Sequence, residues 1–544
     1  LLRLKEIGQE DGRHLIDDGI FQIVPWDESP LQRAGRLSFK PIYAAIRETF
    51  QTAALLPGIG DCAAGGHAYW AAVPELARLF SDEQLAALSG DPLARWIFPS
   101  RGYAETRRSV PALYRYLATL PVGLVEEEDL LKDRQRRESI GRISAAFIEG
   151  QTVDWLCRGR HALVVRHNGG AQAGHTVTDG GFRFVFHQLG SGSHQGCPVF
   201  WSRSFLPDLL KLGEEAEAFA SLDHPAIVYA DPDCACTTVY DVLLNSLTEQ
   251  LRDKKRHGSC GMGIFETVLR TRDTPYALFL HEFEETDEDK IVGKLRNIRE
   301  NYTKPRLENL KQEYPGRFVC PEIAGWTDLI YDENVLYNTA AEMCENFRKY
   351  VRLIKWQDIA EKYDTVIFEN AQGLMLDWDN EAYAPHLTAS NTGLQNVENL
   401  LEELEQSEHR AAPCPLEVIY VSRTYVTRHG AGRLDYECAK EEINPQMEDR
   451  TNVPNPWQGA LRYARHPEGD AFFEYMQKDL KVLRRPFTAA LRLTHLDETQ
   501  GKIIFSDQGR SMEAFCKYCR TKAPGLLKTI YTDLQQRQET IYLN

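Results

Sequence analysis

From about residue 140 to the end of the chain, short apolar runs alternate with helical patterns. Most of these runs are continuously apolar, which is typical of strands in a sheet covered by helices on both faces. The strand candidates are Ala162–His167, Phe182–Leu189, Ala226–Ala230, Thr365–Glu369, Leu416–Val426, Ala489–Thr494 and Lys502–Ser506. Helical patterns include Asp287–Tyr314, Tyr337–Tyr363 and Leu394–Glu405. The alternation predicts an α/β fold in which helices flank a large, mostly parallel central sheet.

The first 135 residues have a different character, with Ala- and Leu-rich helical stretches such as Ser81–Ser89 and Val110–Leu120. The charged run Glu126–Arg137 reads as a solvated helix or a linker. We therefore expect a mainly helical N-terminal extension, residues 1–135, followed by an α/β domain, residues 136–544. A separate partner-binding role for the extension is one hypothesis.

The chain of 544 residues carries a net charge of −16. An acidic surface argues against broad binding of nucleic acid or anionic membranes. The chain has no apolar run of about 20 residues, as a membrane helix needs, and no visible signal peptide, so we expect a cytoplasmic protein. Among the twelve cysteines, the pairs Cys234/Cys236 and Cys516/Cys519 lack a second pair or a histidine at zinc spacing, which favours free thiols.

Small and polar residues follow several of the predicted strands, where α/β sheets bind their ligands. The turn Gly169–Val177 holds three glycines and ends on His175, although tight packing alone also explains such a turn. Small residues with a hydroxyl at His257–Ile264 precede a helix and suit either a phosphate or a helix cap. Amides and hydroxyls at Phe368–Gly373 and Leu387–Thr392 suit a base or a ribose.

Two further strand ends complete the set. One runs into the glycines of Tyr425–Gly432, and the other ends at Leu493–Asp497, where a carboxylate offers acceptors for a guanine. In chain order the five motifs read GGAQAGHTV, HGSCGMGI, ENAQGLMLDWD with LTASNT, VTRHGAG and THLD. This series resembles the adenylosuccinate synthetase family, whose motifs read GGxNAGHT, TTGRGIGP, EGAQGTLLDID with VTSSNT, TRVGAG and TKLD.

The resemblance covers about residues 140–544 and implies a fold related to P-loop NTPases. It implies a ligase that uses GTP and Mg²⁺ to join an amine donor, normally aspartate, to carbon 6 of a purine nucleotide. GTP first phosphorylates the 6-oxygen, and the amine then displaces phosphate. The implied partners are a purine nucleotide (IMP, dGMP or a relative), an amino-acid donor and a second copy of the chain.

Site residues follow from the same motif matches. The resemblance implies that His175 and Gln372 are catalytic and that Gly174 lies against the metal. The purine nucleotide would contact Ser259, Cys260, Arg270, Thr388, Arg428, Gly430 and Gly432, with Arg270 reaching the phosphate of the neighbouring subunit. His495, where the family has lysine, and Asp497 would bind GTP.

The sequence departs from the family pattern in two places. The glycine loop GDEGKGK, which supplies the catalytic base and phosphate cradle, has no counterpart beside Arg142–Leu156, and Glu149 is the nearby carboxylate that could serve as a base. The donor loop TTGRxRR is replaced by Asp449–Arg462, which leaves Arg450, Thr451 and Arg462 as candidates for holding a carboxylate. Two hypotheses therefore stand: a GTP-dependent ligase with an altered donor, and a purine-nucleotide sensor or scaffold that has lost the chemistry.

Overall fold

The computed structural model describes residues 142–147, 150–272, 274–284, 287–407, 416–447, 458–534 and 537–543. The chain divides into two units, Leu1–Glu138 and Ser139–Asn544. All described residues belong to the second unit, so the expected helices of residues 1–135 lie outside the described part. Within that part, no helix combines the length and the apolar character needed to span a membrane.

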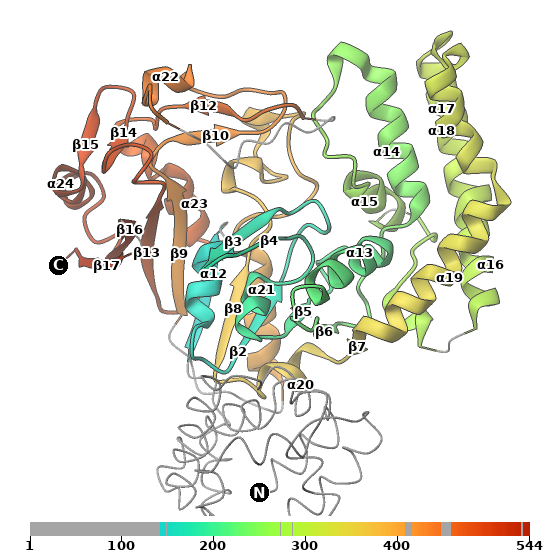
Figure 1. The fold of residues 1–544 in the computed structure, drawn as a ribbon, viewed down its shortest axis with the longest axis horizontal. Coiled ribbons are helices and arrows are strands. Elements are labelled where there is room, and N and C mark those ends of the chain that lie inside the picture. Colours follow the sequence, from blue (N-terminus) through green and yellow to red (C-terminus); the bar gives the residue numbers. More distant parts are fainter. Residues whose placement is uncertain are drawn as a thin grey trace, which may run out of the picture. The chain divides into compact units, whose positions relative to one another are not determined.

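A ten-stranded sheet runs through the middle of this unit (Figure 1). In spatial order its strands are β17 (Arg537–Tyr542), β16 (Thr529–Leu534), β13 (Phe487–Thr494), β9 (Leu416–Arg423), β1 (Arg142–Phe147), β8 (Thr365–Glu369), β2 (Ala162–Arg166), β5 (Val199–Trp201), β6 (Val228–Ala230) and β7 (Val351–Leu353). All neighbouring pairs are parallel except β16 with β17. The predicted α/β class with a large, mostly parallel sheet is therefore confirmed.

Helices cover both faces of the sheet, as the continuously apolar strands require. On one face, side chains of β2, β8, β9 and β13 form a core with α20 (Trp356–Ala360), α21 (Gln395–Gln406), α23 (Glu474–Leu480) and α24 (Met512–Lys522). On the other face, alternate residues of the same strands, such as Val164 and Ile419, pack on α12 (Gly150–Cys157). This pattern buries the central strands on both sides.

A second core lies beyond β5 and β6 and joins a group of helices (Figure 1). They are α13 (Leu209–Ala220), α14 (Val239–Arg252), α16 (Glu288–Ile298), α17 (Lys304–Glu313), α18 (Pro321–Tyr331) and α19 (Glu333–Tyr350). Helix α15 (Ile264–Arg272) packs on α14. The N-terminus of α14 is capped by Asp241 in its first turn, which accepts hydrogen bonds from the backbone amide (2.8 Å) and the hydroxyl (2.9 Å) of Thr238.

The remaining strands form three small sheets. They are the hairpin β3 (His175–Asp179) with β4 (Phe182–Phe186), the trio β10 (Val426–Arg428), β12 (Arg462–Ala464) and β11 (Glu437–Cys438), and the pair β14 (Lys502–Ile504) with β15 (Gly509–Ser511). Helix α22 (Lys440–Ile443) follows β11 in the chain. The predicted strands at 182 and 502 therefore exist but belong to small sheets. The prediction of one helix over Tyr337–Tyr363 was wrong, because the chain turns into β7 after Tyr350.

Candidate functional site

The polar strand ends gather along one edge of the sheet because parallel strands all finish at the same side. Arg166 at the end of β2 pairs in register with Glu369 at the end of β8. Farther along the same edge, Arg423 at the end of β9 pairs with Thr494 at the end of β13. Strands β9 and β1 separate β13 from β8, which corresponds to about 14 Å along the edge.

His175 lies at this edge and is bound to a buried carboxylate. Its Nδ1 is 2.7 Å from Oε1 of Glu369. The same Oε1 accepts a hydrogen bond from the hydroxyl of Ser191 at 2.5 Å, and Oε2 accepts one from the amide of Ser191 at 3.0 Å. The guanidinium of Arg166 is 3.5 Å from the same carboxylate. Burial opposes ionisation, but the charge of Arg166 and the hydrogen bonds from His175 and Ser191 outweigh it and lower the pKa of Glu369 to about 2.

An ionised Glu369 fixes the orientation of the imidazole. Because the carboxylate is an acceptor only, Nδ1 of His175 carries the hydrogen that lies between them. Nε2 of His175 is buried and has no hydrogen-bond partner among the described residues. A buried polar atom without a partner costs free energy, so Nε2 is the atom that a bound ligand would satisfy.

Around Gly169 lie amide side chains whose buried polar atoms also lack a hydrogen-bond partner among the described residues. Both polar atoms of Gln172 and of Gln372, and Nδ2 of Asn168, are buried without partners among the described residues. A Cβ on Gly169 would lie 2.7 Å from Nε2 of Gln172 and 3.2 Å from Oε1 of Gln372, so the two amides approach the same glycine. The cluster of unsatisfied donors and acceptors around Gly169, in the turn that ends on His175, marks a polar ligand seat.

The second motif lies next to the first. A Cβ on Gly170 would overlap the carbonyl oxygen of Leu206 and lie 2.7 Å from Cδ1 of Ile264, the first residue of α15. The hydroxyl of Ser259 donates to Oδ1 of Asn245 at 2.9 Å, and burial raises the pKa of the Cys260 thiol. The two predicted phosphate contacts, Ser259 and Cys260, thus belong to a loop that packs close to the histidine turn.

The third and fourth motifs meet this loop from the other side. His386 donates from Nδ1 to the carbonyl of His257 at 2.9 Å, and Arg428 donates to the carbonyl of His386 at 2.8 Å. A Cβ on Gly258 would lie 3.0 Å from the amide nitrogen of Ala431, between Gly430 and Gly432. Nearby, Thr388 donates its amide to the carbonyl of Leu376 at 2.9 Å. Four of the five motifs therefore adjoin one another.

Arg270 does not lie where the sequence predicted. It is fully buried on α15, and its guanidinium binds both carboxylate oxygens of Asp241 at 2.9 and 2.8 Å and donates to the carbonyls of Cys236 and Tyr276. These partners belong to the same chain, so the expected reach to a neighbouring subunit is corrected: Arg270 braces α15 against α14. Two residues on, the guanidinium of Arg272 lies over the ring of Trp378, 5.3 Å from its centroid.

Arg462 also has a different placement. Its guanidinium pairs with both carboxylate oxygens of Glu437 and donates from Nη1 to the carbonyls of Gly430 at 3.1 Å and Gly432 at 2.8 Å. A guanidinium committed in this way does not offer the bidentate face that a donor carboxylate requires. The expected donor contact is therefore corrected, and Arg462 holds the turn 430–432 instead.

The predicted GTP contacts lie at the β13 end of the edge. Asp497 is exposed on the turn after β13, and His495 has a left-handed backbone, φ 61°, with its Nδ1 2.9 Å from the hydroxyl of Thr494. The described contacts do not join these residues to His175, so a guanine site here stays a prediction.

Three predicted site residues, Glu149, Arg450 and Thr451, lie outside the described residues. Only Ile148 and Glu149 separate the end of β1 from the start of α12. A Cβ on Gly150, the first residue of α12, would lie 3.0 Å from the hydroxyl oxygen of Ser191 and 3.1 Å from the carbonyl carbon of His175. Helix α12 therefore begins directly against the backbone of His175 and the hydroxyl of Ser191, with its partially positive end at this point.

The resemblance predicts a metal site beside Gly174. Gly174, predicted to lie against a metal, is exposed, and a Cβ there would meet only Val185 at 3.9 Å. Glu369, the carboxylate beside it, already binds His175, Ser191 and Arg166, so the described residues here do not fit a Mg²⁺ ion that prefers oxygen ligands.

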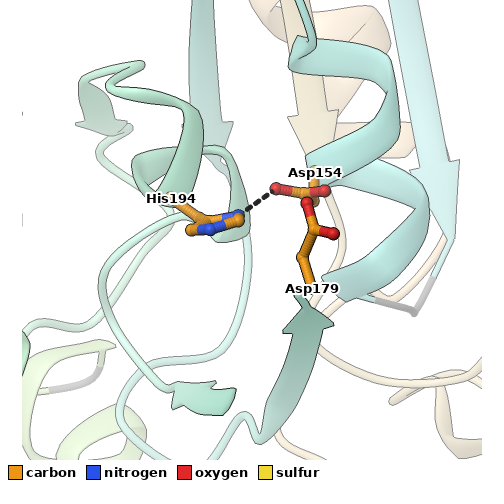
Figure 2. A group of neighbouring side chains, drawn as sticks. All are labelled: Asp154, Asp179 and His194. Carbon is orange, nitrogen blue, oxygen red and sulfur yellow. Dashed lines mark hydrogen bonds and ion pairs between the residues drawn. The ribbon is translucent and has the colours of Figure 1, made fainter. Parts of the chain in front are cut away.

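One other cluster in the described part of the chain has metal-ligand spacing: Asp154, Asp179 and His194 (Figure 2). His194 binds Asp154 at 2.8 Å, and Arg158 binds Asp154 at 3.1 Å and Asp179 at 3.0 Å. The guanidinium already supplies the positive charge between the two carboxylates, so the cluster is an ion-pair network.

Sequence reasoning missed Glu369, Ser191, Arg166 and Gln172 as site residues. Arg166 and Glu369 carried a signal, since each is a charged residue that ends an otherwise apolar strand. Ser191 carried none, because its contact with Glu369 joins residues far apart in the sequence.

Comparison with known proteins agrees with the motifs. The sequence profile of adenylosuccinate synthetase matches residues 149–452, more than half of the chain. Adenylosuccinate synthetase of Marinomonas sp. is 25% identical over 303 residues, covering 54% of this chain and 63% of the relative. That of Picrophilus torridus is 26% identical over 296 residues, with the same shares. The chain thus spans less than two thirds of the length of these relatives.

Two solved structures are similar. The fully ligated adenylosuccinate synthetase of Plasmodium falciparum aligns with a TM-score of 0.46 and 17% identity, covering 67% of this chain and 79% of that one. Cyanophage S-2L succinoaminodeoxyadenylate synthetase, bound to dGMP and dATP as an energy donor, aligns with a TM-score of 0.45 and 13% identity, covering 72% and 92%. By the extent of the profile match, the chain belongs to the adenylosuccinate synthetase family.

Proposed function

We propose that this protein binds a purine nucleotide with its 6-position against His175 and joins an amine donor to carbon 6 in a GTP-dependent reaction. The observation that carries the proposal is the unpartnered Nε2 of His175, held in one orientation by the ionised Glu369. Family membership supports the reaction class.

The reaction has two steps. A base takes the N1 proton of the purine, and Glu149 is the carboxylate proposed for this role. Oxygen 6 then attacks the γ-phosphorus of GTP, and GDP leaves. The amine nitrogen then attacks carbon 6, the C6–O bond breaks, and inorganic phosphate leaves while the nitrogen loses a proton. A protonated Nε2 of His175 would donate a hydrogen bond to the charge that develops on the phosphoryl oxygens.

The other side chains would support this geometry. Glu369 holds the imidazole in one orientation, as a carboxylate does for a catalytic histidine. Gln172 and Gln372 present the donors and acceptors that the edge of a purine requires. His495 and Asp497 would take the guanine of GTP farther along the sheet edge, and Cys260 would lie near the nucleotide phosphate.

A binding protein without turnover is the second candidate. The observation that favours it is the connection of β1 to α12 through two residues, Ile148 and Glu149, in place of a glycine loop with aspartate and lysine. Phosphoryl transfer needs a base and a cradle for the phosphates, and Glu149 is the carboxylate that this connection offers.

One experiment separates the two candidates. Purified protein is incubated with GTP, Mg²⁺, IMP or dGMP, and a panel of amino acids, while phosphate release and the mass of the nucleotide product are followed; H175A is the control. The ligase predicts phosphate release and a nucleotide–amino-acid conjugate that both require His175. Calorimetric binding of IMP or dGMP without turnover supports the sensor, and absence of binding contradicts both.

A homodimer and a cytoplasmic location are parts of the same proposal, and Mg²⁺ would enter with the phosphates of GTP rather than on a carboxylate of the described residues. Because the guanidinium of Arg270 binds Asp241 of its own chain, Arg270 gives no support to the proposal of a dimer. Sedimentation equilibrium with and without IMP tests it directly.

A further inference from the structure

Helix α14 presents two acceptors to the loop 257–263 from one face, Asn245 and Glu249, which are four residues apart. Oε2 of Glu249 accepts hydrogen bonds from the amides of Gly258 at 3.0 Å and Ser259 at 3.3 Å, and Oε1 accepts from the amide of His257 at 3.4 Å. Asn245 accepts from the hydroxyl of Ser259 and the amide of Gly263. The donors at the start of the loop are thus already used.

Glu249 is placed to be a strong anchor. Its side chain is 1% exposed, and Arg252 donates to Oε1 at 2.7 Å. A buried carboxylate that accepts several hydrogen bonds holds its partners firmly, because breaking them would leave a desolvated charge unpaired. Residues 257–259 therefore cannot shift without disturbing this carboxylate.

The carbonyls of two of these residues, His257 and Gly258, hold the opposite side of the loop. His386 donates to the carbonyl of His257 at 2.9 Å, and Gln458 donates to the carbonyl of Gly258 at 2.7 Å. Gly258, with a φ of 80°, packs directly on Ala431. The loop is a bridge between α14 and the turns that carry Thr388 and Gly430, and Glu249 is its charged support.

The bridge has a consequence for an anionic ligand. The amides of residues 257–259 point to a carboxylate, so a phosphate cannot take them without displacing Glu249. A phosphate would instead meet the loop from Cys260 onward and the N-terminus of α15, whose amides point out of the helix. The carboxylate of Glu249 fixes where that part of the loop lies.

We infer that Glu249 is a positioning residue that aligns the loop 257–263 with the phosphate end of the purine nucleotide. The inference rests on the proposed function, because it concerns the nucleotide that this site would bind. Loss of the carboxylate should reduce the contribution of the phosphate to the binding affinity and leave the contribution of the base unchanged.

The test compares IMP with inosine, and dGMP with deoxyguanosine, by calorimetry in the full chain. E249Q keeps the shape of the side chain but replaces one acceptor oxygen by a donor that opposes the loop amides. We expect the affinity for the nucleotide to fall about tenfold or more and that for the nucleoside to change by less than about twofold. The matched control is E398Q on α21, since Glu398 is an equally buried glutamate that pairs with Arg485; E398Q should leave the ratio of nucleotide to nucleoside affinity unchanged.

A second variant keeps the test decisive if E249Q does not fold. G258A adds a Cβ in a left-handed conformation, 3.0 Å from the amide of Ala431, and should produce the same selective loss. A nucleotide-to-nucleoside ratio that stays at the wild-type value in the folded variants would overturn the inference. If the wild-type protein binds neither IMP nor dGMP, the proposed function has failed, and the inference fails with it.

Discussion

Nδ1 of His175 lies 2.7 Å from Oε1 of Glu369, and this pair joins the turn after β2 to the end of β8. The two residues are 194 positions apart in the chain. The pair gives the site an imidazole of fixed orientation, with one nitrogen committed to the protein and the other left for a ligand.

Replacing Glu369 by glutamine tests the role of the pair in turnover. In E369Q the protonated imidazole loses its ionised partner, so we expect kcat to fall about 10²-fold while the Kd for the purine nucleotide changes little. Steady-state kinetics together with calorimetry separate these two quantities. A kcat near the wild-type value would contradict a catalytic pairing.

The same carboxylate predicts a pH dependence of stability. The pKa of Glu369 is lowered from its ordinary value of 4.5 to about 2, so its ionised form stabilises the fold above about pH 4.5. That stabilisation is lost as the pH falls from about 4.5 to about 2, and its full value is about 3 kcal/mol. Denaturant titrations of wild type and E369Q should therefore converge on acidification. A difference that stays constant with pH would contradict the ionised state.

Gly170 offers a test of the close approach between the first two motifs. In G170A the new methyl group would overlap the backbone carbonyl of Leu206, which cannot move aside as a side chain can, so we expect a loss of about 1–3 kcal/mol of stability. The control is G293A on α16, where a Cβ meets nothing within 4 Å and helix propensity favours alanine. Equal effects in thermal unfolding of the two variants would refute the contact.

Arg462 and Glu437 should behave as one unit. Because Arg462 holds the carbonyls of Gly430 and Gly432, R462K and E437Q should both raise KM for the purine nucleotide, by about tenfold, and leave KM for the amine donor unchanged. Varying each substrate in turn measures the two constants. A rise confined to the KM of the donor would restore the donor-binding role that the sequence suggested.

The sequence predicted the parts of this fold that carry a long apolar signal. Runs such as Thr365–Glu369 and Ala489–Thr494 lie in the central sheet, as expected. Strands of three residues, such as Val199–Trp201 and Val351–Leu353, are too short to show a period, and the latter was absorbed into a predicted helix. The strand predicted at Phe182 forms a hairpin with β3, because its partner is the chain just before it.

The motifs predicted a site at the sheet edge but could not predict the contacts that its residues make. The match of Arg270 to a phosphate-binding arginine could not show that Asp241 lies beside it, since the two are 29 positions apart. Arg462 was likewise assigned by position, while Glu437, its true partner, lies on the neighbouring strand β11. Contacts that depend on the folded chain decide whether an arginine is available to a ligand.

The most direct test of the account is a crystal structure of the protein with IMP or dGMP bound. We predict that oxygen 6 of the purine lies within hydrogen-bond distance of Nε2 of His175, with the amides of Gln172 and Gln372 at the edge of the base. A nucleotide seated elsewhere, with Nε2 of His175 still lacking a ligand, would contradict the account.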